Sequence, residues 1–270
     1  MDISTVLRDA AGGHRLSEKE AAALLKVRGR DIFEIFSTAD ILREERAGPV
    51  VTYVRNQNIH ITNICKNLCG FCGFGRKEGD EGAFCDDRDT ILKKVALASS
   101  RNVTEICLLS GVHPGFTMET YEDILSTVCG AAPGVHIHAF SPDEVMHAAR
   151  QSGIPTSEVL ERMKSAGLSS LQGTAAEILA DHVRSVICPS KVSTAEWVRI
   201  IREAHRMGIP TTATIMYGTC ETEGDRARHL AILREIQDDT GGFTELVPLS
   251  YIFQNTPLYR NGIAGPGCSA

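Results

Sequence analysis

The sequence predicts an α/β fold in which six parallel strands form a partial (βα)6-type barrel behind an N-terminal helical extension. Between residues 58 and 249, six short β-prone runs alternate with longer segments of helical periodicity. Strands separated by helices are joined by right-handed crossovers, which place them parallel in one sheet. Six strands are fewer than the eight of a closed barrel, so we expect a partial one.

The first 48 residues are expected to form the helical extension. Ser17 and Glu20 have the spacing of a capping box ahead of an alanine- and leucine-rich run at residues 21–25. Residues 31–46 space isoleucine and phenylalanine side chains for a second amphipathic helix. We expect these helices to cover one end of the barrel.

The core domain is expected to occupy residues 49–270, with strands and helices in alternation. The strands are predicted at residues 58–62, 105–110, 136–140, 169–172, 211–217 and 244–249. The helices are predicted at residues 87–99, 121–128, 141–151, 156–166, 176–186, 195–207 and 225–239. Residues 262–270 match no element, which leaves open whether the barrel is naturally partial or C-terminally truncated.

Composition favours a soluble enzyme with a single large core. The chain has 270 residues, 43% of them hydrophobic, which is enough to bury one such core. It opens on a polar stretch without a signal peptide, and no apolar run reaches the length of a membrane span. Nine cysteines then indicate a reducing compartment, and we expect a cytoplasmic location. A net charge of -6 without basic runs argues against nucleic acid as a partner.

Three cysteines after the first strand form the most informative motif. Cys65, Cys69 and Cys72 have C-x3-C-x2-C spacing in a loop at the C-terminal end of the strand at 58–62. Three thiolates can hold three irons of a four-iron cluster and leave the fourth iron without a protein ligand. Parallel α/β folds place their chemistry at this end of the strands. Phe71 lies within the loop and can shield such a group from water.

Two other interpretations of the cysteines are weaker. A structural zinc site usually needs four ligands in two separated pairs, and no second pair follows downstream. Structural cysteines of an ordinary core do not cluster within so short a loop. The iron–sulfur interpretation is therefore favoured.

The cysteine spacing resembles that of the radical SAM superfamily. The resemblance implies a [4Fe-4S] cluster whose open iron binds S-adenosylmethionine (SAM), so that reductive cleavage of SAM releases a 5'-deoxyadenosyl radical. It also implies that Ser110 and Gly111, at the end of the second strand, hold the methionine part of SAM.

The fifth strand carries a second, weaker resemblance to that superfamily. Residues 214–221 are similar to the pattern G-x-I-x-G-x-x-E, with Thr214 in place of the first glycine and Met216 in place of the isoleucine. This resemblance implies that Met216, Gly218 and Glu221 border the adenine of SAM.

Two histidines on the third strand are further candidates. Strand alternation puts His136 and His138 on one side of the strand, and therefore both in the barrel interior. Ser141 and Glu144 follow at the C-terminal mouth, and we interpret the group as hydrogen-bonding partners of SAM ribose or substrate in preference to a structural network. His138 is expected nearer the mouth and is the candidate catalytic histidine.

Longer runs resemble a narrower family, which unites deazaflavin (FO) synthase with radical SAM enzymes of the futalosine route to menaquinone. The runs lie at residues 63–65, 136–142, 173–179, 187–189, 211–218 and 237–245. The resemblance extends from about residue 56 to residue 259. Residues 173–177 are most similar to the tyrosine-using (CofH) subunit of FO synthase.

This resemblance implies a transferase that couples the 4-hydroxybenzyl group of L-tyrosine to 5-amino-6-(D-ribitylamino)uracil, a step toward FO and coenzyme F420. The deoxyadenosyl radical would take a hydrogen from the tyrosine amino group, after which the Cα–Cβ bond breaks. A luminal acceptor such as His138 or Glu177 could take the ammonium proton. The implied partners are an electron donor and a second radical SAM subunit of FO synthase.

Two alternatives stay open at the level of sequence. One is aminofutalosine synthase or dehypoxanthine futalosine cyclase, which share the fold and cofactor but act on other substrates. The other is a non-catalytic iron–sulfur scaffold. Tyrosine-dependent cleavage of SAM would separate the first from the transferase, and loss of SAM cleavage with an intact cluster would favour the second.

Overall fold

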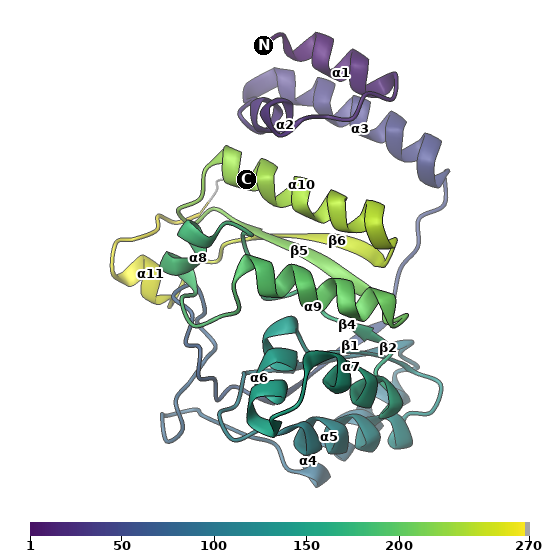
Figure 1. The fold of residues 1–270 in the computed structure, drawn as a ribbon, viewed down its shortest axis with the longest axis vertical. Helices are drawn as coiled ribbons and strands as arrows, with labels where there is room; N and C mark the ends of the chain where they lie inside the picture. Colours follow the sequence, from purple (N-terminus) through teal and green to yellow (C-terminus); the bar gives the residue numbers. More distant parts are fainter. Residues whose placement is uncertain (268–270) are drawn as a thin grey trace.

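The computed structural model describes residues 1–267, so residues 268–270, including Cys268 and the end of the predicted featureless tail, lie outside the described part. Six strands form one parallel sheet whose spatial order follows the chain (Figure 1). They are β1 Asn56–Thr62, β2 Glu105–Ser110, β3 His136–Ala139, β4 Ser170–Leu171, β5 Thr211–Tyr217 and β6 Phe243–Ser250. The predicted α/β class and strand number are confirmed. Because β1 and β6 are the two edges of the described sheet, the barrel is partial.

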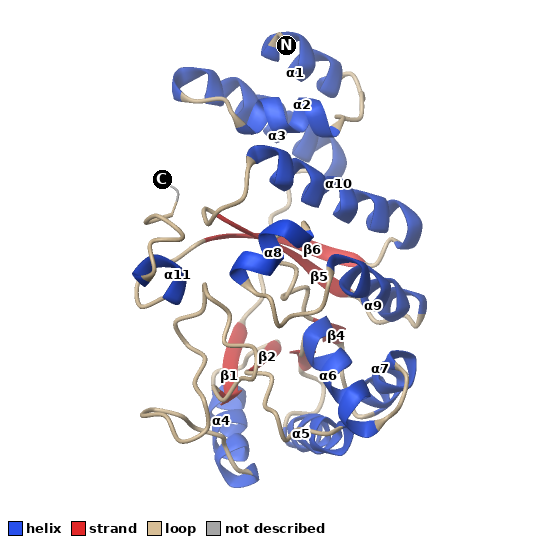
Figure 2. Cartoon of the chain, turned by 60° about the vertical axis from the view of Figure 1, so that its left-hand side comes forward, coloured by secondary structure: helices blue, strands red, loops and turns tan. Residues whose placement is uncertain are grey.

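Helices follow the strands in the predicted alternation and lie outside the curved sheet (Figure 2). They are α4 Arg88–Ser100, α5 Met118–Ala131, α6 Pro142–Ser152, α7 Thr156–Ser165, α8 Asp181–Ile187, α9 Thr194–Arg206 and α10 Glu223–Thr240. A short helix, α11 Pro257–Arg260, which the sequence pattern did not predict, follows β6. No helix among residues 1–267 combines the length and the apolar composition needed to cross a membrane.

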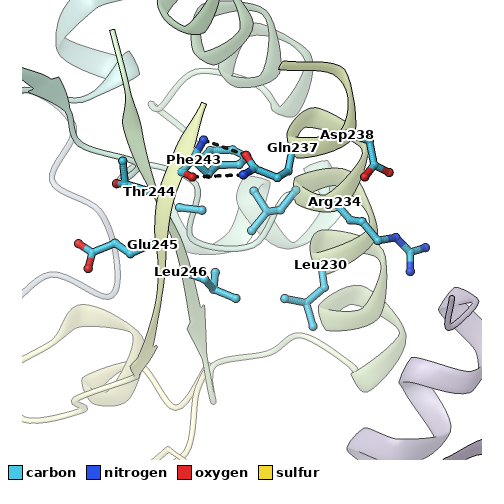
Figure 3. A pocket seen from close by; sticks show the side chains of 10 residues that line it. Leu230, Arg234, Gln237, Asp238, Phe243, Thr244, Glu245 and Leu246 are labelled. Carbon is cyan, nitrogen blue, oxygen red and sulfur yellow. Dashed lines mark hydrogen bonds between the residues drawn. The ribbon is translucent and has the colours of Figure 1, made fainter. Parts of the chain in front are cut away.

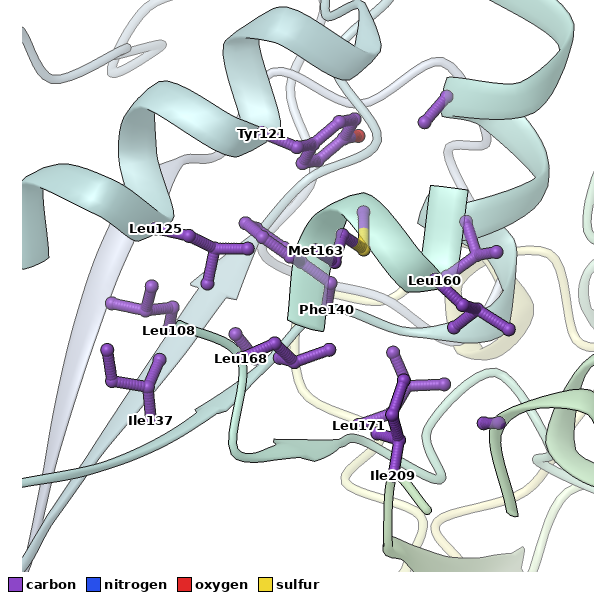
Figure 4. Packing of buried hydrophobic residues seen from close by; sticks show 14 of the residues in the cluster. Leu108, Tyr121, Leu125, Ile137, Phe140, Leu160, Met163, Leu168, Leu171 and Ile209 are labelled. Carbon is purple, nitrogen blue, oxygen red and sulfur yellow. The ribbon is translucent and has the colours of Figure 1, made fainter. Parts of the chain in front are cut away.

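The main hydrophobic core fills the space between the sheet and these helices. Leu108 of β2 and Ile137 of β3 point to Leu125 of α5 and Met163 of α7 (Figure 4). All four side chains are almost fully buried, and burial of each such side chain contributes about 1.5–3 kcal/mol. The strand residues between these apolar ones point to the opposite face of the sheet, into the barrel interior. Several of them, such as His136, His138 and Thr212, are polar.

Two of the outer helices begin with a capping box made of serine and glutamate. Ser141 and Glu144 form a capping box on α6, and Ser193 and Glu196 form one on α9. In each box the serine hydroxyl accepts from the N3 backbone N–H, and the glutamate side chain accepts from the serine backbone. The boxes fix both helix starts, and the one on α6 lies at the C-terminal edge of the sheet.

The N-terminal extension contains α1 Ile3–Ala11, α2 Glu18–Leu25, the 3-10 turn η1 Gly29–Asp31 and α3 Ile32–Ala47. The predicted capping box of Ser17 and Glu20 on α2 is confirmed. The prediction that these helices cover one end of the barrel is wrong, because α2 packs on the outer helix α10 (Figure 1). Arg228 of α10 pairs with Glu18 at 2.6 Å, and Arg234 donates to the carbonyl of Leu16 at 2.7 Å. The outward arginines of α10 hold the extension there.

The helix predicted at residues 176–186 is also shorter than expected. It begins only at Asp181, because Ala175 and Glu177 adopt positive φ angles of 69° and 45°. This left-handed region cannot continue a right-handed helix. The segment between β4 and α8 is therefore a loop, and Glu177 lies on it.

Candidate active site

The three motif cysteines line one cavity at the C-terminal edge of the sheet. Cys65, Cys69 and Cys72 are all free thiols, and the cavity they share has a volume of about 270 Å³. The loop is fixed at both ends, since Cys65 N–H donates to the carbonyl of Arg76 and Gly70 N–H donates to the carbonyl of Ile187. The structure thus brings the predicted ligands together.

The end of β2 forms one wall of this cavity. Ser110 and Gly111 line it, as does Val112, whose carbonyl accepts from Lys66 N–H at 2.9 Å. A Cβ atom on Gly111 would lie 2.5 Å from the carbonyl oxygen of Ile64. Only glycine therefore lets the second strand pass this close to the cysteine loop.

The predicted residues Phe71 and Ser141 also line the cavity, together with polar residues that the sequence analysis did not single out. These are His60, Asn63, Asn67, Asp143, Gln172, Thr174 and Lys191. Asp143 is buried and accepts from the side chain of Asn67 and from the backbone N–H of Val192. These contacts link the cysteine loop, α6 and the segment after α8.

Lys191 supplies the positive charge of the cavity. Its ammonium lies 2.8 Å from Glu177 Oε1, and the two side chains are 15% and 8% exposed. Burial lowers the pKa of Lys191, but the carboxylate of Glu177 and other negative groups outweigh it and hold this pKa well above the ordinary value. The same ammonium lies 5.7 Å from the centre of the Phe71 ring. Lys191 lies in an irregular segment without a recognisable motif, so no local pattern could have identified it.

The chemistry of these donors fits an iron–sulfur cluster better than a single metal ion. Among residues 1–267, no three His, Cys, Asp or Glu side chains converge on one ion position. In a four-iron cluster each cysteine binds a different iron, so convergence on one point is not required. Burial raises the pKa of Cys69, and iron binding would favour its thiolate form.

The predicted residues at the end of β5 do not line this cavity. Met216 packs in a second hydrophobic cluster that also contains Cys69. Gly218 has a φ angle of 96°, and Glu221 accepts from its N–H at 2.6 Å. Glu221 also pairs with Arg226 at 2.6 Å. Burial raises the pKa of Glu221, but these hydrogen bonds outweigh it and lower the pKa below its ordinary value. The turn at the end of β5 is therefore stabilised by the contacts that Glu221 makes with Gly218 and Arg226.

The predicted catalytic histidine lies elsewhere. His138 and His136 both contact the hydroxyl of Ser170, at 2.7 and 2.8 Å, so they share a strand face as expected. They line a different cavity, of about 430 Å³, together with Glu105 and Thr212 from the first residues of β2 and β5. His138 is nearer the C-terminal end of β3 than His136, as expected, but it does not line the cysteine cavity. Glu177 does not line the cysteine cavity itself, and its carboxylate reaches that cavity only through Lys191.

A third cavity, of about 390 Å³, lies between α10 and β6 (Figure 3). Its Gln237 side chain is already paired with both backbone groups of Phe243, and Arg234 and Asp238 are bonded to the N-terminal extension. Leucine side chains form much of the remaining wall. This groove holds no set of groups suited to catalysis.

Comparison with known proteins identifies the superfamily. Residues 59–233 match the family model described as the radical SAM superfamily. The FeFe-hydrogenase maturase HydG from Carboxydothermus hydrogenoformans has the same fold, with a TM-score of 0.76 and 18% identity over 99% of this chain and 59% of that chain. The chain therefore belongs to the radical SAM superfamily.

Closer relatives narrow the assignment. The 5-amino-6-(D-ribitylamino)uracil--L-tyrosine 4-hydroxyphenyl transferase of Methanosphaerula palustris is 60% identical over 268 residues. The enzyme of the same name from Methanoculleus marisnigri is 59% identical over 267 residues. Each alignment covers 99% of this chain and 73% of the relative. The chain belongs to this family of transferases.

Proposed function

We propose that this chain couples the 4-hydroxybenzyl group of L-tyrosine to 5-amino-6-(D-ribitylamino)uracil by radical SAM chemistry. One observation carries the proposal: three free cysteines line one cavity in a chain 60% identical to a relative named for this reaction. The futalosine-route alternatives have no comparable support among the relatives described above.

The cysteine cavity is the proposed cofactor site. Cys65, Cys69 and Cys72 would hold the [4Fe-4S] cluster, and Ser110 and Gly111 would contact SAM from the adjoining wall. When bound, the cluster and SAM supply the one-electron chemistry that makes an organic radical. Because Gly111 has no Cβ, the end of β2 can lie directly against the backbone of Ile64 on this side of the cavity.

The other wall is suited to charged and polar parts of the ligands. Lys191 would pair with a ligand carboxylate, while its contact with Glu177 holds its position. Ser141 and Phe71 would border SAM on this side. Met216 N–H donates to the carbonyl of Glu177 at 2.9 Å, so the end of β5 supports this wall from behind.

We further propose that Met216, Gly218 and Glu221 act in SAM binding through the shape of the β5 turn. Glu221 receives hydrogen bonds from Gly218 N–H and Thr219 N–H, which fixes the turn. A fixed turn would position the adenine through its backbone, without contact from a charged side chain. The resemblance of residues 214–221 to the superfamily pattern supports this role.

An external electron donor and a second radical SAM subunit are the proposed partners. The cluster must be reduced for each cleavage of SAM, and the coupled product requires a further cyclisation to reach the deazaflavin. Both partner proposals rest on the family resemblance.

The proposal is tested by anaerobic turnover of the reconstituted protein with a chemical reductant. We expect 5'-deoxyadenosine to form when tyrosine is added, and not when tyrosine is replaced by an aminofutalosine-type purine nucleoside. The Cys69→Ala variant is the control for adventitious SAM breakdown. Cleavage that depends on the nucleoside and not on tyrosine would overturn the proposal.

A further inference from the structure

One acidic side chain of the cysteine cavity has an oxygen that nothing in the described structure uses. Glu144 lies in the first turn of α6, is 3% exposed and lines the cavity. Its Oε2 accepts from the N–H and from the hydroxyl of Ser141, both at 2.8 Å. Its Oε1 is buried and has no hydrogen-bond partner within residues 1–267. A buried oxygen without a partner is costly, so its position needs an explanation.

The other two carboxylates of this region are already occupied. Asp143 accepts from Asn67 and from the backbone of Val192. Glu177 is paired with Lys191 at 2.8 Å. Glu144 is thus the acidic group of the cavity with capacity for a further donor.

In the capping box of α9, both carboxylate oxygens of the glutamate have hydrogen-bond partners. Glu196 occupies the same capping-box position and accepts from Ser193 N–H at 2.9 Å. Its other oxygen, Oε1, is bonded to Arg150 at 3.2 Å. The free oxygen of Glu144 is therefore not a general consequence of the capping box.

We propose that Glu144 Oε1 receives a hydrogen bond from the α-amino group of an amino-acid ligand in the cysteine cavity. An α-amino acid carries an amino and a carboxylate group on one carbon, and the cavity offers Glu144 for the first and Lys191 for the second. Two ligands of the proposed function share this chemistry, namely the methionine part of SAM and tyrosine. The inference rests on the proposed function.

The protonation of Glu144 is consistent with this role. Burial raises the pKa of Glu144 to about 8, although hydrogen bonds from Ser141 lower it. Without ligand the buried carboxyl is therefore largely neutral at neutral pH and avoids an unpaired buried charge. An arriving ammonium would favour the carboxylate form and bind it strongly.

The test combines a substitution with removal of the ligand amino group. Glu144→Gln keeps the capping box, because glutamine serves equally at this position, but places an NH2 donor where Oε1 was. Glu196→Gln is the matched control outside the cavity. Binding to the reconstituted protein is measured by calorimetry for S-adenosylhomocysteine and for its analogue without the amino group. A second arm, with S-adenosylhomocysteine present, measures tyrosine and 3-(4-hydroxyphenyl)propionate.

We expect Glu144→Gln to weaken at least one amino-bearing ligand roughly tenfold or more, the range for a hydrogen bond to a charged group. The matching analogue without the amino group should bind the variant and the wild type about equally. Glu196→Gln should leave all four affinities unchanged. The arm in which the tenfold effect appears identifies whether SAM or tyrosine contacts Glu144.

Equal weakening of each ligand and its analogue would overturn the inference and assign Glu144 a structural role, for instance through a water to the buried Tyr121 hydroxyl. Unchanged affinities in both arms would overturn it as well. Failure of the proposed function is distinguishable, because a wild-type protein that binds S-adenosylhomocysteine but not tyrosine refutes the substrate while the first arm still decides the role of Glu144.

Discussion

A Cβ atom on Gly111 would lie 2.5 Å from the carbonyl oxygen of Ile64 and 3.0 Å from Cys65 Cβ. The end of β2 and the cysteine loop are therefore in direct backbone contact. A carbonyl cannot move away as a flexible side chain can, so the loop itself would have to shift.

Gly111→Ala is expected to displace the cysteine loop and lower the iron content of the reconstituted protein. Overpacking of this kind costs about 1–3 kcal/mol. Iron and sulfide per chain, together with the free energy of unfolding, measure both effects. Gly130→Ala is the control, since a Cβ at Gly130 meets nothing within 4 Å in the helix α5. It should keep full iron and gain up to about 1 kcal/mol of stability. Full iron content in Gly111→Ala would show that the loop tolerates the shift.

Substitution of any one motif cysteine is expected to abolish reductive cleavage of SAM. Cys65→Ala, Cys69→Ala and Cys72→Ala should each lose most of the roughly four irons per chain, because each thiolate holds a different iron. Cys85→Ala and Cys129→Ala, at exposed cysteines outside the cavity, should keep them. If Cys69→Ala assembled a complete cluster that cleaves SAM, the ligand assignment would be wrong.

His138 is expected to act in stability and not in chemistry. Its ring contacts Ser170 in the cavity near the strand beginnings, away from the cysteines. His138→Ala should cost about 0.5–1.5 kcal/mol of unfolding free energy for the lost hydrogen bond, with more from lost packing. Tyrosine cleavage per cluster, measured as glyoxylate released from iminoacetate, should stay within about threefold of wild type. A tenfold loss at full iron content would restore the catalytic role that the sequence suggested.

The buried histidine of α10 predicts how stability depends on pH. His229 Nδ1 accepts from Leu179 N–H at 3.0 Å, and burial lowers the pKa of His229 to about 4. The unfolded chain binds this proton at an ordinary pKa of about 6.5, so its stabilising contribution is complete above that pH. It is lost as pH falls from about 6.5 toward about 4, by about 3 kcal/mol in total.

Urea unfolding of the cluster-free, reduced protein at a series of pH values measures this slope. Glu144, whose pKa is raised to about 8, acts in the opposite sense, since its stabilising contribution falls as pH rises from about 4.5 to about 8. Both effects are present in the wild type, so the comparison with His229→Asn isolates the histidine. The variant should show a smaller loss of stability toward acid pH. An unchanged slope would mean that the pKa of His229 is not lowered in the folded protein.

The sequence predicted the strands better than the loops between them. The residues of β2 and β5 were predicted correctly because alternating or continuous β-branched and apolar runs depend on local pattern alone. The start of α8 was not, because the positive φ angles of Ala175 and Glu177 have no signature in non-glycine residues. Local pattern determines periodicity but not these turns.

The candidate site shows the same division. The cysteine loop was predicted from spacing, and the structure assembles it. Alternation placed His138 on the inner face correctly, but it could not give the depth along the barrel, which depends on how β3 and β4 are aligned. Lys191 reaches the cavity from a segment far from the cysteines in sequence, so only the tertiary fold could reveal it.

The most direct test of the account follows the tyrosine ring through the reaction. Reconstituted protein, SAM, reductant and 5-amino-6-(D-ribitylamino)uracil are incubated anaerobically with ring-labelled tyrosine, and the products are separated by mass. We predict that the label appears in a uracil adduct carrying the 4-hydroxybenzyl group, in proportion to 5'-deoxyadenosine, and that Cys69→Ala forms none. A protein with full iron content that cleaves SAM without transferring the labelled ring to the uracil would contradict the central claim.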